Sequence, residues 1–298
     1  MLGYACMNNT LRDREPPLRC NRDMQQATFE ERGLSYVSEL ARQNMQDLHA
    51  ILAWNVEHDI YFYRCTSTLV PWNSQFDLPE LPDYERLRTL AKRCGAIIRD
   101  NDMRFTFHPD YWCRLGSDTR ETRENSVDAV EYHADWLDLL GLDRSPYYGI
   151  NVHIGATYGD KDATARRFRD AVRALSPGAR SRLTVENDDK ESLWSVPELV
   201  EAVDDTGVPV VFDYHHHSFT DRGLTYREGF EQAATTWGDI RPATHYSEPA
   251  RLAGEDARPQ AHAASVSAVP RWLAERSDVM IEADGKEQAV FQARQART

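Results

Sequence analysis

The chain has 298 residues, of which 41% are hydrophobic and 28% are charged, so a sizeable core can be buried. No apolar run approaches the roughly 18 residues that a membrane helix needs, and the first residues show no signal peptide. Five cysteines without a CxxC pair favour reduced thiols, so we expect a cytoplasmic protein. The formal net charge of −13 argues against a nucleic-acid partner unless bound cations reverse the local sign.

Short apolar runs rich in β-branched and aromatic residues alternate with helical patterns along the chain. We expect strands at 2–6, 59–65, 104–109, 147–155, 182–188, 208–217, 243–248 and 278–284. We expect helices at 31–55, 83–100, 121–142, 162–178 and 196–207, after a long polar loop from about residue 7 to residue 26. Neither a linker nor a repeat divides this alternation, so we predict one domain over residues 1–298.

Residues with metal-binding side chains stand at the carboxyl ends of six of these strands: His108, His153, Glu186, Asp213, His245 and Glu282. They are spaced roughly 30 to 45 residues apart, close to the roughly 30 residues of one strand-plus-helix unit in a (β/α)8 barrel. Such barrels carry their active sites at the carboxyl ends of the strands. We therefore predict an α/β fold of the (β/α)8, or TIM, barrel type, with a multinuclear metal enzyme site on one rim.

Imidazole and carboxylate ligands without a nearby thiolate favour zinc, manganese or iron over an iron–sulfur cluster. Glu186 stands near the middle of the set, where a carboxylate could bridge two ions. Two or three ions a few ångströms apart can neutralise charge on a scissile phosphodiester.

The run DYHHH leaves the choice of its histidine ligand open. Asp213 and His216 share a DxxH spacing around the end of a strand, while His215 and His217 are alternatives or orient a ligand. His262, in RPQAHA, is a further candidate. The remaining histidines are interpreted as structural or solvated: His49, His58 and His133.

Together these segments resemble the ultraviolet-damage endonuclease family (UVDE/UvsE) of the endonuclease IV-like barrel superfamily. The resemblance runs from residue 2 to about residue 288. It is carried by LGYACMNNTL, LVPWNSQ, FHPDYW, NVHIGATYGDK, TVENDD, VPVVFDYHHH, RPATHYSE, RPQAHA and DVMIEADGKEQ.

The resemblance implies an ATP-independent, metal-dependent DNA-repair endonuclease. Its members hydrolyse the phosphodiester 5′ to ultraviolet photolesions (cyclobutane dimers and 6-4 photoproducts) and leave a 3′-hydroxyl and a 5′-phosphate. The implied partner is damaged double-stranded DNA, and we expect a monomer with no membrane association. The implied cofactor is two or three divalent ions, with manganese first and zinc or magnesium as alternatives.

Site residues follow from the same resemblance. The implied metal ligands are His108, His153, Glu186, Asp213, His216, His245, His262 and Glu282. Catalytic roles fall to Glu186 and to Lys286, which would contact phosphate, with a plain surface lysine as the simpler interpretation. Tyr4 and Asn8 are expected near the DNA, with core packing and turn formation as their alternatives.

The chain departs from the family pattern at three places. Gln75 stands where the family usually has a histidine ligand, so one ion is expected to be lost or weakly held. Ala243 replaces a lysine two residues before His245. Tyr111 and Trp112 stand where the family probes the duplex with a glutamine–aromatic pair, and aromatic side chains suit that role because damaged bases unstack at low cost.

Two other functions stay open. A sugar isomerase or epimerase of the same barrel superfamily would suit the acidic charge, although the histidine-rich rim does not favour it. A damage-binding barrel with reduced turnover would follow from Gln75 and Ala243, but such a protein has no need for eight ligands in order.

Overall fold

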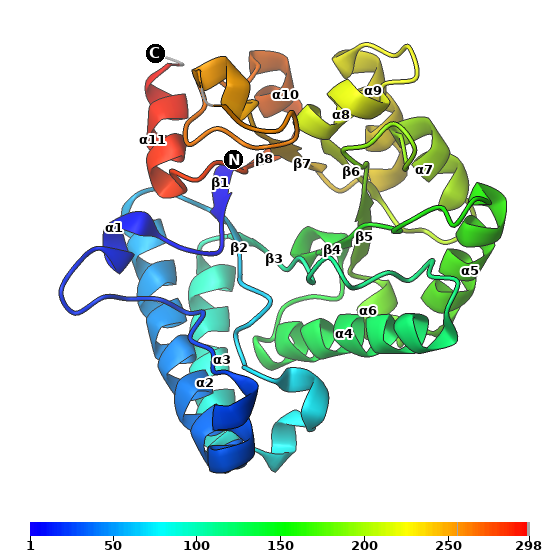
Figure 1. The fold of residues 1–298 in the computed structure, drawn as a ribbon. Helices are drawn as coiled ribbons and strands as arrows, with labels where there is room; N and C mark the ends of the chain where they lie inside the picture. Colours follow the sequence, from blue (N-terminus) through cyan, green and yellow to red (C-terminus); the bar gives the residue numbers. More distant parts are fainter. Residues whose placement is uncertain (255, 297–298) are drawn as a thin grey trace.

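Eight parallel strands form a barrel that helices surround in the computed structural model, which describes residues 1–254 and 256–296 (Figure 1). The strands are β1 (Leu2–Ala5), β2 (Phe62–Arg64), β3 (Arg104–Thr106), β4 (Ile150–Val152), β5 (Leu183–Glu186), β6 (Val210–Asp213), β7 (Ala243–Tyr246) and β8 (Asp278–Ile281). Their order is β3-β2-β1-β8-β7-β6-β5-β4. The predicted TIM-barrel fold is confirmed.

The two ends of this sheet meet just beyond β3. Phe107 forms a parallel bridge with Ile150, in which the Phe107 N–H donates to the Gly149 carbonyl at 2.9 Å and the Asn151 N–H donates to the Phe107 carbonyl at 2.9 Å. The bridge joins β3 to β4 and brings the carboxyl ends of all eight strands to one rim.

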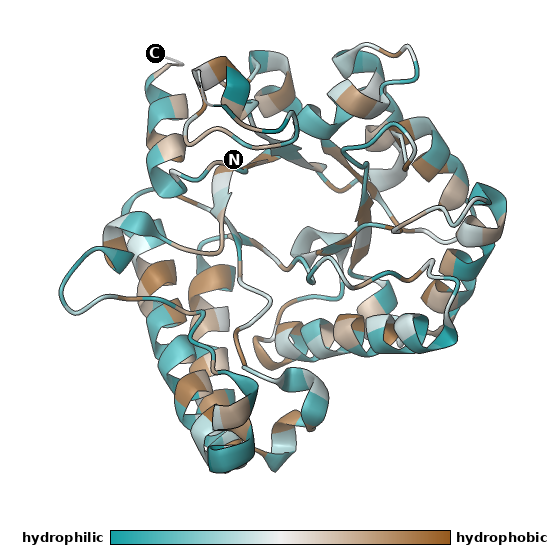
Figure 2. Cartoon of the chain, viewed as in Figure 1, coloured by the Kyte–Doolittle hydropathy of each residue, from teal (hydrophilic) through white to brown (hydrophobic). Residues whose placement is uncertain are grey.

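The helices lie outside the strands. They are α1 (Asn9–Arg12), α2 (Gln26–Glu57), α3 (Tyr84–Asp100), α4 (Arg120–Leu139), α5 (Lys161–Ala174), α6 (Pro177–Arg180), α7 (Val196–Ala202), α8 (Tyr214–Thr220), α9 (Tyr226–Ala234), α10 (Arg271–Arg276) and α11 (Glu287–Gln295). Figure 2 shows that single helices carry both hydrophobic and hydrophilic residues, as expected when one face packs on a barrel. No helix among the described residues has the length and apolarity to cross a bilayer.

An apolar layer fills the barrel below the rim. Ala5, Phe62, Val211, Ala243 and Met280 come from five strands and pack together with the Trp237 ring. Side chains two residues apart on a strand share one face. Positions 64, 213, 245 and 282 therefore stand above this layer, on the side of the carboxyl ends.

A buried ion pair closes the opposite end of the barrel. Arg104 and Asp278, which begin β3 and β8, form a fully buried ion pair at 3.0 Å. Arg241 also contacts Asp278, at 3.1 Å, and the Arg104 guanidinium lies over the Tyr147 and Trp237 rings. Because this end is filled, the open rim is the place for chemistry.

Several expected boundaries differ from those observed. Polar residues 7–26 contain the helical turn α1, because the Asn8 side chain accepts from the Leu11 N–H and caps it. Pro177 begins α6 rather than ending a helix, since Ser176 caps a new turn there. The expected strand at 208–217 ends at Asp213, which caps α8, so the three histidines are helical.

Three further helices were not predicted, α9, α10 and α11. α9 begins with a capping box in which Thr225 and Glu228 bond each other's backbone N–H groups. Serine or threonine followed three residues later by glutamate is a sequence signal for a helix start, so α9 could have been found.

Candidate metal centre

Glu186, the last residue of β5, lies at the centre of the histidine cluster. Its carboxylate stands 3.0 Å from His245 Nδ1, 3.3 Å from His216 Nδ1 and 3.5 Å from His108 Nε2. His153 Nε2 lies 3.9 Å from the same carboxylate. Four elements thus direct imidazoles at one buried acid.

Three overlapping groups of side chains among the described residues can each hold a metal ion. They are His108–His153–Glu186, Glu186–Asp213–His216 and Asp213–His245–Glu282. Glu186 and Asp213 each belong to two groups, so each carboxylate can bridge neighbouring ions. Seven of the eight predicted ligands are brought together in this way.

An unpaired polar atom inside the cluster fits a bound cation. Asp213 Oδ2 is buried and has no hydrogen-bond partner in the described protein. Buried polar atoms are normally paired, and an exception calls for a ligand, water or ion. Nitrogen and carboxylate donors suit manganese and zinc, so the residues present fit divalent ions.

Backbone carbonyls orient three of the imidazoles, and His216 Nδ1 lies 2.9 Å from the carbonyl of Asn187. His108 Nδ1 lies 2.9 Å from the Pro109 carbonyl, and His262 Nδ1 lies 2.8 Å from the Glu282 carbonyl. Because a carbonyl oxygen only accepts, each Nδ1 must carry the proton and each Nε2 keeps a free lone pair. This arrangement is the usual way in which proteins prepare histidine ligands. His262 stands beside the three groups, with its ring 6.2 Å from that of His216.

Buried side-chain amides hold the carboxylate of Glu186 and the backbone of Asp213. The Asn151 side chain donates to Glu186 Oε2. Asn187 donates to the Asp213 carbonyl at 3.1 Å and accepts from the Asp213 N–H at 2.8 Å. The sequence interpretation missed both asparagines. Asn151 lies two residues before His153 and Asn187 directly follows Glu186, so strand alternation was the signal that could have identified the first.

Arg64, at the end of β2, forms an ion pair with Glu282. Both side chains are largely buried, with 14% and 13% of their surfaces exposed. The guanidinium therefore adds a fixed positive charge at the edge of the cluster.

Burial and neighbouring charges shift the pKa values in opposite directions. Burial alone would raise the pKa of Glu186, but the surrounding imidazoles of His245, His108 and His216 hold it well below its usual value. Burial raises the pKa of Asp213, and the negative charge of Glu186 adds to that rise. Burial opposes charge on His153, but the Asp188 carboxylate 3.0 Å from Nδ1 outweighs it and raises the pKa of His153 to about 9.

The other histidines of the DYHHH run point elsewhere. His217 Nε2 donates to the Leu224 carbonyl at 3.1 Å, and its ring packs on Phe212. His215 Nε2 is buried without a partner among the described residues, and its ring stands edge-on to His262. His216 alone of the three belongs to a metal group, which supports the DxxH interpretation.

Two residues expected near the DNA are instead buried. Tyr4 is fully buried between β1 and α2, where its hydroxyl donates to Asn55 Oδ1 at 2.7 Å. Asn8 is 1% exposed and donates to the Tyr4 hydroxyl at 3.0 Å. Packing and helix capping use both side chains, so neither offers an exposed surface at the rim. The alternative roles, core packing and turn formation, are those observed.

Lys286 follows β8 and directly precedes α11. Its backbone has a positive φ of 52°, which is costly for a residue with a side chain. Its Nζ lies 4.0 Å from Asp284 Oδ1, and the side chain is 21% exposed. The lysine is thus at the rim with a free face, as contact with a phosphate requires.

Two aromatic residues project from the loop after β3. Tyr111 is 84% exposed and Trp112 is 40% exposed. An exposed pair of aromatic rings can stack on unpaired bases. Their exposure supports the predicted lesion contact.

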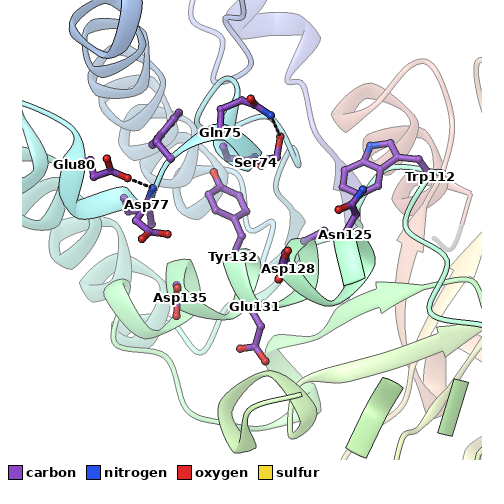
Figure 3. A pocket seen from close by; sticks show the side chains of 14 residues that line it. Ser74, Gln75, Asp77, Glu80, Trp112, Asn125, Asp128, Glu131, Tyr132 and Asp135 are labelled. Carbon is purple, nitrogen blue, oxygen red and sulfur yellow. Dashed lines mark hydrogen bonds between the residues drawn. The ribbon is translucent and has the colours of Figure 1, made fainter. Parts of the chain in front are cut away.

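A cleft of about 680 Å³ is lined by none of the eight predicted metal ligands (Figure 3). Trp112 and Asn125 line one part of it, and Gln75 lines another. The Gln75 amide donates to Ser74 Oγ at 3.3 Å and the residue is exposed. Gln75 therefore contacts none of the ligands through an observed hydrogen bond.

Comparison with known proteins accounts for this constellation. A profile of the family described as UV-endonuclease UvdE matches residues 1–296. The chain belongs to this family.

Its relatives in the UvdE family include fungal and bacterial proteins. A UV-damage endonuclease of Neurospora crassa is 31% identical over 98% of this chain and 50% of its own length. A UV DNA damage endonuclease of Bacillus cereus strain Q1 is 32% identical over 85% of this chain and 80% of its own length. The chain thus spans about half the length of the fungal relative. The crystal structure of SacUVDE has 28% identity and a TM-score of 0.84, covering 98% of this chain and 96% of that chain.

More distant barrels share the fold alone. Endonuclease IV from Thermus thermophilus is 17% identical with a TM-score of 0.55, covering 84% of this chain and 93% of that chain. At position 243 this chain has an alanine, whose methyl group packs in the apolar layer with Met280. At that position it therefore offers no polar atom to an ion.

Proposed function

We propose that this UvdE-family chain is a metal-dependent DNA-repair endonuclease that hydrolyses the phosphodiester 5′ to an ultraviolet photolesion, leaving a 3′-hydroxyl and a 5′-phosphate. The observation that carries this proposal is the set of three overlapping ligand groups, which share Glu186 and Asp213 at the open rim of the barrel. Two or three divalent ions, manganese first, would supply Lewis acidity toward the phosphodiester.

The chain's own residues would hold and orient the substrate. Glu186 belongs to two of the ligand groups, so its carboxylate would help to hold two ions whose positive charge stabilises the phosphate. Lys286 would contact a phosphate oxygen from the loop after β8. Tyr111 and Trp112 would fill the space left where the damaged duplex opens, because photolesions weaken base stacking.

The acidic charge of the chain is compatible with this substrate. Several of the 48 acidic residues belong to the cluster, where bound cations would reverse the sign that the DNA meets. A monomeric state, a cytoplasmic location and a single domain stay predictions.

Incision of an ultraviolet-irradiated, end-labelled duplex with added manganese tests the proposal. We expect a nick directly 5′ to the photolesion, lost in Glu186→Gln and kept in Glu228→Gln, whose carboxylate only caps α9. Cleavage of undamaged DNA at the same rate would contradict lesion specificity.

The two alternatives give other outcomes in this assay. Tight binding to the irradiated duplex without a nick under any divalent ion would indicate a damage-binding protein. Neither binding nor cleavage, together with turnover of ketoses, would indicate an isomerase or epimerase.

A further inference from the structure

Arg64 and a bound metal ion would compete for the same oxygen atom, Oε1 of Glu282. Glu282 Oε1 lies 3.3 Å from His245 Nδ1, an atom of another member of the Asp213–His245–Glu282 group. The same Oε1 accepts the ion pair from Arg64 Nη1. An ion held by His245 and Glu282 would therefore meet the guanidinium at close range, and two cations at one oxygen repel each other.

The barrel leaves the arginine few places to go. Arg64 reaches Glu282 across β1, where its partner in register is the small Ala5. Below it lies the apolar layer that contains Phe62 and Met280, which would not accept a charge. A displaced guanidinium can therefore move only toward the open rim.

The guanidinium also keeps unused donors. Arg64 Nε is buried without a hydrogen-bond partner in the described protein. A planar guanidinium with free N–H groups is well suited to two oxygens of one phosphate. The rim above Arg64 is where the proposed substrate would present its scissile phosphate.

We propose that Arg64 is a counter-cation of the metal centre that yields Glu282 to the incoming ion and then binds the scissile phosphate. Only the second half of this inference, the contact with the scissile phosphate, rests on the proposed function. The first half, competition between Arg64 and the ion for Glu282, needs no DNA and can be tested alone.

The competition predicts opposite effects on metal binding and on cleavage. Removing the positive charge in Arg64→Gln should tighten binding of the first Mn²⁺ by at least about tenfold, because Glu282 no longer has a competing partner. At saturating Mn²⁺ the same variant should incise irradiated duplex about a hundredfold more slowly, the usual loss when one charge-stabilising donor is removed. Arg64→Lys keeps the charge but not the fork, so its Mn²⁺ affinity should stay near wild type while incision falls.

Each protein is first made metal-free and is then titrated with Mn²⁺, and the free Mn²⁺ is measured by electron paramagnetic resonance. The proteins are the wild type, Arg64→Gln, Arg64→Lys and Arg173→Gln. Arg173 is the control, because it pairs with two acids on the outer surface at 3.1 Å. Unchanged or weaker Mn²⁺ binding in Arg64→Gln would overturn the competition. Incision within threefold of wild type at saturating Mn²⁺ would overturn the phosphate contact.

The two proposals can fail separately. If wild type does not cut irradiated DNA, the proposed function fails while the Mn²⁺ titration still decides the competition. If Arg64→Gln does not fold, Arg64→Lys decides the phosphate contact through its incision rate, and Arg64→Met, which also removes the positive charge, decides the competition. Mn²⁺ binding to Arg64→Met that is no tighter than binding to wild type would overturn the competition.

Discussion

Asn151 donates a hydrogen bond from its side-chain amide to Oε2 of Glu186, the carboxylate shared by two of the metal groups. The amide cannot turn over, because the Thr184 hydroxyl donates to Asn151 Oδ1 at 2.9 Å. All three side chains are buried in the barrel. A chain of hydrogen bonds from β4 and β5 therefore sets the direction in which Glu186 presents its oxygens.

Replacing this amide should weaken metal binding without removing a ligand. We expect Asn151→Ala to lower Mn²⁺ affinity by about 10- to 100-fold, the usual effect of losing a residue that orients a ligand. Asn151→Asp should be at least as severe, because it places a second carboxylate against Glu186. Isothermal titration calorimetry with Mn²⁺ measures both. The control is Asn101→Ala, whose amide donates to the Ile97 carbonyl at the end of α3. Equal Mn²⁺ affinity in all of these variants would show that Asn151 orients nothing.

Removal of metal should destabilise the fold. Glu186 and Asp213 are buried beside the largely buried Glu282, and a bound cation would relieve the repulsion among these carboxylates. At a free Mn²⁺ concentration a hundredfold above Kd, binding should add about 2.7 kcal/mol to the free energy of unfolding. Thermal unfolding with a chelator and with added Mn²⁺ measures the gain.

Asp213→Asn is the variant for that experiment. The asparagine oxygen can still cap α8, as Asp213 Oδ1 does by accepting from the His216 N–H at 2.7 Å. The variant should therefore fold but gain much less stability from Mn²⁺ than wild type. An equal gain would exclude Asp213 as a ligand.

The barrel and most ligands could be predicted from the sequence because both depend on simple periodicities. A buried parallel strand is a short apolar run, and the residue at its carboxyl end faces the rim. Glu186 and His245 follow from this rule alone. The rule does not distinguish a rim position from a core position, since the outward face of a strand is also buried. Tyr4 was misplaced for that reason: it lies on β1 but faces α2.

Contacts between distant elements could not be predicted in the same way. Arg64 and Glu282 are far apart in sequence, and nothing local indicates that the small Ala5 lets them meet across β1. The helical course of the DYHHH run depends on Asp213 acting as a cap, which a strand pattern hides. The choice among His215, His216 and His217 therefore needed the structure.

The His153–Asp188 pair should make the stability of the metal-free protein depend on pH. The pKa of His153 is about 9 in the folded chain and about 6.5 in an unfolded one. A raised folded pKa means that the pair stabilises the fold fully below pH 6.5 and that this contribution is lost as pH rises through 9. Urea unfolding of the chelated wild type between pH 6 and pH 10 should therefore show a decline that Asp188→Asn lacks. Parallel curves for the two proteins would refute the pairing. Mn²⁺ affinity should rise over the same range, because a ligand histidine must lose its proton.

The exposed pair Tyr111 and Trp112 should contribute to DNA binding and hardly at all to folding. Stacking of a base on an aromatic ring is worth roughly 1–3 kcal/mol, so Tyr111→Ala and Trp112→Ala should each weaken binding to irradiated duplex by about 5- to 150-fold. The thermal midpoint of Tyr111→Ala should stay at the wild-type value, since that side chain is 84% exposed. Fluorescence anisotropy with matched irradiated and undamaged duplexes measures the loss. Tyr61→Ala is the control, because Tyr61 precedes β2 at the closed end of the barrel. If the two rim variants lose affinity for damaged and undamaged duplex equally, the pair holds DNA in general and does not probe the lesion.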